Sequence, residues 1–119
     1  MPETEEIMSD ITLPKASAAL AARRHALAPD IDDAFAAWSK AVLADGALDK
    51  RTKQLIALAV AHVTQCPWCI EGHTKGAKRE GATNEQIMEA IWVAAEMRAG
   101  AAYAHANKTL ALLDEIDGG

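Results

Sequence analysis

The sequence predicts an all-α protein, a compact helical bundle of about five to six helices. Hydrophobic residues make up 50% of the 119 residues but aromatic ones only 4%, and alanine supplies much of the apolar content. Apolar residues recur at i, i+3 and i+4 spacing, which is the period of one helix face. Neither strand-like alternation nor a hairpin dipeptide appears in the sequence. This pattern argues against a β fold and indicates close helix–helix contacts.

The N-terminal third of the chain divides into an arm and two helices. Residues 1–14 lack helical periodicity and end in Pro14, so we expect an N-terminal arm there and a single helical domain over 15–119. The alanine-rich segment 15–28 is expected to be a short helix that the following proline closes. The next helix, within 30–46, carries an apolar stripe: Ile31, Ala34, Phe35, Trp38 and Val42.

The middle of the chain predicts two helices with defined starts. Asp49 is a suitable N-cap for a helix over 51–65, whose middle is apolar on nearly all sides. Such a helix is buried in a core, in a subunit interface, or in both. The following helix should begin at Cys66 with Pro67 in the first helical position and end near residue 81.

The last predicted helix has a capping box at its start. Thr83 is the expected N-cap and Gln86 follows three residues later. We expect the helix to run to about Leu113, with a kink around 98–105. The small residues of 93–106 would let another backbone approach closely, and the apolar excess favours a homo-oligomer.

Charge and targeting signals narrow the class of protein. The formal net charge is −5 and the sequence has no run of Lys or Arg, which argues against nucleic acid or anionic lipid as a partner. The N-terminus is acidic and no apolar run approaches the roughly 20 residues that cross a membrane, so we expect a cytoplasmic protein. Because that compartment keeps thiols reduced, the two cysteines need an explanation other than a structural disulfide framework.

The two cysteines and a histidine form a Cys-x-x-Cys-x-x-x-His motif. With Cys66 at the N-cap and Cys69 one turn later, the Cα atoms should lie roughly 5–6 Å apart, within the range of a disulfide. The N–H groups and dipole of the helix start stabilise a thiolate there. His73 lies four residues after Cys69, and its side chain leans back over that turn, where it can take and return the thiol proton.

Two other interpretations of the motif stay open. His62 precedes Cys66 by four residues, which gives four potential zinc ligands within twelve residues, although they would have to meet across one tight turn. The cysteines could instead be inert residues of the core. Trp68 is better explained by packing than by chemistry, and Glu71 by a solvated charge.

Residues 53–102, which include CPWCIEGH, resemble the AhpD-like branch of the carboxymuconolactone decarboxylase superfamily, and the resemblance covers about residues 30–113. It implies an all-helical fold that assembles as trimers or hexamers and acts as an alkyl hydroperoxide reductase or thiol–disulfide oxidoreductase. By this resemblance Cys69 reacts with the peroxide, Cys66 completes the disulfide and exchanges with the reductant, and His73 belongs to a proton relay.

The relay departs from the family pattern at one position. The family's glutamate, twelve residues before the first cysteine, is replaced here by Gln54, which cannot accept a proton. His62, eight residues after Gln54 on the same helical face, is the natural substitute, and Glu96 and His105 are further candidates. The chain also has Trp68 where well-known members have a histidine.

The sequence therefore predicts a thiol-dependent hydroperoxide reductase with an antioxidant role, without a cofactor or a resident metal. Its partners would be a hydroperoxide and a dithiol reductant, such as a lipoyl domain or a thioredoxin-like protein. The alternatives are a carboxymuconolactone decarboxylase-like lyase, whose branch does not use the cysteine pair, and a non-catalytic zinc-clipped module.

Overall fold

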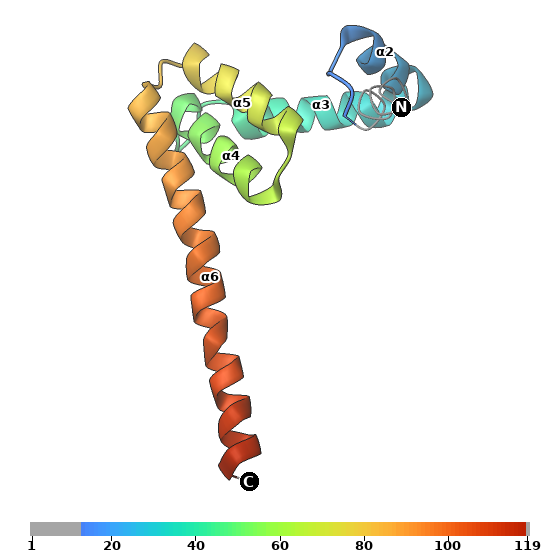
Figure 1. Ribbon diagram of the computed structural model, residues 1–119. Helices are drawn as coiled ribbons and strands as arrows, with labels where there is room; N and C mark the ends of the chain where they lie inside the picture. The colour runs from blue at the N-terminus through green and yellow to red at the C-terminus, as the bar shows by residue number, and fades with distance from the viewer. Residues whose placement is uncertain (1–12, 119) are drawn as a thin grey trace, which may run out of the picture. The chain divides into compact units, whose positions relative to one another are not determined.

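The computed structural model describes residues 13–118, and five α-helices and no strand occur among them (Figure 1). The all-α prediction is confirmed. The helices are α2 (Ala18–Leu27), α3 (Pro29–Leu43), α4 (Lys50–Thr64), α5 (Pro67–Arg79) and α6 (Asn84–Gly118). Residues 1–12 of the expected N-terminal arm lie outside the described residues.

The described chain divides into two compact units after Ala44. The first unit contains α2 and α3, and the second contains α4, α5 and α6. In the second unit, α4 packs against both α5 and α6. All buried residues of the described chain belong to this second unit. The single domain expected over 15–119 remains a prediction.

The first unit is a pair of short helices linked by polar contacts. Helix α2 begins after the N-cap Ser17, whose side chain accepts the Leu20 N–H at 3.2 Å. His25 of α2 contacts the Asp33 carboxylate of α3 at 2.8 Å. Neither helix contains a buried residue, so the apolar stripe predicted on α3 is exposed within the described chain.

Local capping fixes the helix starts of the second unit, as the sequence predicts. The Asp49 carboxylate accepts the Thr52 N–H at 2.7 Å, and this backbone hydrogen bond lowers the pKa of Asp49. At the start of α6, the Gln86 N–H donates to Thr83 Oγ1 at 3.1 Å, and the Thr83 N–H donates to Gln86 Oε1 at 3.0 Å. This reciprocal pair is the predicted capping box.

The core of the second unit is small and rich in alanine. Leu58 of α4 is fully buried, and Leu55 and Ile91 pack against the buried cluster around it. The other buried apolar residues are Ala61, Ala77, Ala82, Ile87 and Ala94. Because alanine side chains are short, the helices can approach one another closely at these positions.

Helix α6 is longer than predicted and continues through 98–105 to Gly118 without the expected kink (Figure 1). Glycine and alanine in that stretch retain their backbone donors, so the helical hydrogen bonds continue. Only the N-terminal part of α6 packs on α4, and every residue from 101 to 118 is exposed. None of the described helices has the length and apolar character needed to cross a membrane.

Candidate active site

The turn between α4 and α5 positions the cysteine pair. Gln65 ends α4 in the left-handed region with φ 58° and ψ 48°, a conformation usually taken by glycine at helix ends. The Cys66 N–H donates to Ala61 O at 3.1 Å, which closes the last turn of α4. Cys66 is then the N-cap of α5, and Pro67 occupies its first turn. The predicted start of this helix is confirmed.

Cys66 and Cys69 form a disulfide within the first turn of α5, with a Cα–Cα distance of 5.2 Å. The Cys69 N–H lies 3.2 Å from Cys66 Sγ, so the N-cap sulfur accepts a hydrogen bond from the helix start. Cys69 is exposed and Cys66 is half-buried. The Cys69 N–H and the helix dipole at this position would stabilise a thiolate at Cys66 once the disulfide is reduced.

His73 and Gln54 are hydrogen-bonded across the α4–α5 contact. His73 Nδ1 lies 2.9 Å from Gln54 Oε1, and both residues are half-buried. His73 lies one helical turn after Cys69 on α5. The structure therefore brings the histidine of the motif together with the residue at the family's relay position.

Gly76 makes room for the Gln54 amide. A Cβ atom built on Gly76 would overlap Gln54 Oε1 and would lie 2.7 Å from Cδ and 3.2 Å from Nε2. Gly76 is buried, so the amide lies directly against the α5 backbone. Gly76 could not be recognised from the sequence, because a glycine inside a helix signals close packing but does not identify the residue it packs against.

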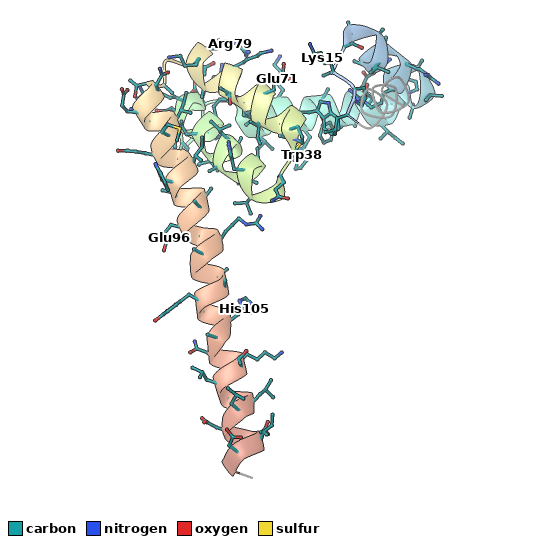
Figure 2. All side chains as sticks on the ribbon, viewed as in Figure 1. Lys15, Trp38, Glu71, Arg79, Glu96 and His105 are labelled. Atoms are coloured by element: carbon teal, nitrogen blue, oxygen red, sulfur yellow. A yellow bond between two sulfur atoms is a disulfide. The ribbon has the colours of Figure 1, made fainter. Side chains whose placement is uncertain are left out.

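The other candidate relay residues are not hydrogen-bonded to His73 in the described chain. His62 Nδ1 lies 2.9 Å from Leu58 O on its own helix. In Figure 2, Glu96 points away from α4 and α5, and His105 lies farther toward the end of α6. His105 Nδ1 lies 2.6 Å from the carbonyl oxygen of Ala101, again on its own helix.

Arg98 is a second residue that the sequence analysis missed. Its Nη1 donates to Val63 O at 2.6 Å, which ties α6 to the last turn of α4 just before the cysteine pair. A cation at the C-terminal end of a helix also interacts favourably with the helix dipole. An arginine in the middle of a long helix carries no sequence signal for such a distant partner.

The candidate zinc ligands have other partners in the structure. Within residues 13–118, no group of three or more His, Cys, Asp and Glu side chains is arranged to hold a metal ion. The sulfurs of Cys66 and Cys69 bond to each other. Glu71, labelled in Figure 2, pairs with Lys75 at 2.9 Å on the surface of α5, as expected of a solvated charge.

The protein is all-α, and its helix α5 starts at a disulfide-forming cysteine pair with a histidine one turn later. These features define a class of helical proteins with a Cys-x-x-Cys pair at a helix N-terminus. The family model of the carboxymuconolactone decarboxylase family matches residues 29–111, and the chain belongs to this family. Its similarity to AhpD proteins places it in the AhpD-like branch of the superfamily.

Several relatives cover different shares of the chain. "Uncharacterized protein 4 in cox locus" from Paracoccus denitrificans is 82% identical over 93% of this chain and 99% of its own length. The alkyl hydroperoxide reductase AhpD from Corynebacterium kroppenstedtii is 39% identical over 43% of this chain. The matched region covers 29% of the length of that protein. The crystal structure of apo-lpg0406, a carboxymuconolactone decarboxylase family protein from Legionella pneumophila, has a TM-score of 0.65 and 32% identity, with 97% of both chains covered.

Proposed function

We propose that the protein is a thiol-dependent hydroperoxide reductase with an antioxidant role. The observation that carries this proposal is the Cys66–Cys69 disulfide in the first turn of α5. With this disulfide formed, α5 keeps its N-terminal turn, which supports a pair that cycles between the oxidised and reduced forms. Similarity to the alkyl hydroperoxide reductases AhpD of Corynebacterium kroppenstedtii and Maricaulis maris supports the same chemistry.

The proposed cycle has three steps. The Cys69 thiolate attacks a hydroperoxide ROOH, breaks its O–O bond and releases ROH, leaving Cys69 as a sulfenic acid. The Cys66 thiol then condenses with that sulfenic acid, forming the disulfide and releasing water. A dithiol donor reduces the disulfide by thiol–disulfide exchange and becomes a disulfide itself. The exposure of Cys69 supports its role as the sulfur that meets the peroxide.

The donor in this proposal is a protein or small-molecule dithiol, such as a lipoyl domain or a thioredoxin-like protein. Such donors remain reduced in the cytoplasm, which is the compartment that the proposal assigns. Decarboxylation, the reaction in the family's name, would leave the cysteine pair without a role. The disulfide at the helix start favours the redox function over that alternative.

Intact-mass spectrometry tests the function directly. One equivalent of an organic hydroperoxide, added to fully reduced protein, should lower the mass by about 2 Da, the loss of two hydrogens. A dithiol should restore the original mass and a second addition should lower it again. An unchanged mass, with both cysteines still open to alkylation, would show that the pair does not react with hydroperoxide.

We also propose that the protein works as a homo-oligomer, a trimer or a hexamer, in which a second copy covers the apolar residues of α6. Trp92, Tyr103 and Leu110 are 68%, 85% and 57% exposed within the described chain. The chain also exposes further large apolar residues on α4, among them Ile56 and Val60. Apolar surface of this extent is unusual for a monomer and typical of a subunit interface.

Charge placed on α6 should break the assembly. We expect Leu110→Asp to lower the molar mass measured by light scattering after size-exclusion chromatography, because a carboxylate in a buried interface is strongly unfavourable. Asn107→Asp adds the same charge on the same helix at a polar position and is the matched control. A wild-type monomer, or an equal effect of both substitutions, would contradict the proposal.

A further inference from the structure

The hydrogen bond between Gln54 and His73 determines which ring nitrogen carries the proton. The amide oxygen Oε1 can only accept, and it lies 2.9 Å from His73 Nδ1. With the amide in this orientation, His73 Nδ1 is the N–H donor. In a neutral imidazole the other nitrogen, Nε2, then holds the lone pair that can accept a proton.

The packing of Gln54 holds its amide in this position. Gly76 leaves the space that Gln54 Oε1 occupies, and any larger residue there would overlap it. Gln54 comes from α4 and His73 from α5, and these helices pack against each other in the second unit. The amide is thus confined between its hydrogen bond to His73 and the backbone of Gly76.

We propose that Gln54 is a positioning residue, which holds neutral His73 as the Nδ1–H tautomer so that Nε2 accepts the thiol proton. This inference rests on the proposed hydroperoxide reductase function. The proton path ends at His73, because the Gln54 amide accepts a hydrogen bond but takes up no proton. This proton path requires no carboxylate, and it does not require His62, Glu96 or His105.

The proton balance follows from this arrangement. The thiol proton moves to His73 Nε2, which gives a thiolate and an imidazolium with a proton on each nitrogen. Nδ1–H keeps its bond to Gln54 throughout. When the thiolate cleaves the O–O bond of the hydroperoxide, the departing alkoxide takes a proton and leaves as ROH, and His73 returns to its neutral form.

Nitrogen NMR of the histidine rings, together with thiol alkylation, tests the assignment without hydroperoxide. At about pH 9, where histidine is neutral, the ¹⁵N shifts distinguish the two ring tautomers. We expect the Nδ1–H form for His73 in the reduced protein, with His73→Gln identifying its signals. Gln54→Met, which keeps the size but removes the acceptor, should shift His73 to a mixture of tautomers. It should also slow iodoacetamide alkylation at pH 7 by about tenfold or more.

Gln54→Glu is the matched control, because a carboxylate oxygen also accepts from Nδ1–H and should preserve this tautomer. An Nε2–H tautomer in the wild type would overturn the assignment, even if Gln54→Met does not fold. Unchanged alkylation in a folded Gln54→Met variant would overturn the positioning role. If the tautomer and alkylation results hold while hydroperoxide leaves the mass unchanged, the proposed function fails and the positioning of His73 stands.

Discussion

Replacing Cys69 by serine is expected to abolish hydroperoxide consumption, because the variant lacks the sulfur that attacks the O–O bond in the proposed cycle and serine is a far weaker nucleophile at neutral pH. Consumption of an organic hydroperoxide in the presence of a dithiol measures the loss. The double variant in which both Cys66 and Cys69 are serine gives the background rate of consumption. The Cys69→Ser variant should consume hydroperoxide at this background rate.

Replacing Cys66 by serine should have a different result. The remaining Cys69 thiolate can still react once, so about one equivalent of hydroperoxide should be consumed and a sulfenic acid should remain. Dimedone labelling followed by intact mass detects that species. If both single variants keep full activity, the cysteine pair is not the reaction centre. If Cys66→Ser, and not Cys69→Ser, abolishes the first turnover, the assigned roles of the two sulfurs are reversed.

Replacing Gly76 by alanine is expected to displace the Gln54 amide and to destabilise the protein. The new Cβ would overlap Gln54 Oε1, so the amide or helix α5 must move. Overpacking of this kind typically costs about 1–3 kcal/mol. Alanine also gains roughly 0.5–1 kcal/mol of helix propensity over glycine, which offsets part of the loss. We expect a net fall in the free energy of unfolding, together with slower thiol alkylation.

Gly72, on the same helix, is the matched control for Gly76. A Cβ atom at Gly72 would have no heavy atom within 4 Å, so alanine there should only add helix propensity. Gly72→Ala should therefore stabilise the protein by about 0.5–1 kcal/mol in urea unfolding. Equal stabilisation by the two substitutions would show that Gly76 does not need to be glycine for the sake of Gln54.

The parts of the structure predicted most closely depend on residues near one another in the sequence. The caps at Asp49 and Cys66 and the capping box of Thr83 and Gln86 each join groups three residues apart. The backbone of a single turn sets such distances, so residue type and spacing are enough to predict them. For the same reason the disulfide geometry of the cysteine pair could be anticipated.

The surroundings of His73 depend on contacts between helices, which the sequence does not specify. From the sequence, Gln54 was the departure from the family pattern and His62 was the expected substitute base. In the structure, His62 is bonded within its own helix, whereas Gln54 itself contacts His73. Gly76 and Arg98 were missed, because their roles depend on the residues of α4 that they contact.

The sequence by itself determined the helical class of this protein, the starts of its last three helices and the spacing of Cys66, Cys69 and His73. Only the tertiary structure decided that Gln54, nineteen residues before His73, reaches its Nδ1 atom and that Gly76 leaves room for the amide. The reason is physical. Hydrogen bonds within one turn follow from helix geometry, whereas a contact between α4 and α5 depends on how closely and in which register the two helices pack.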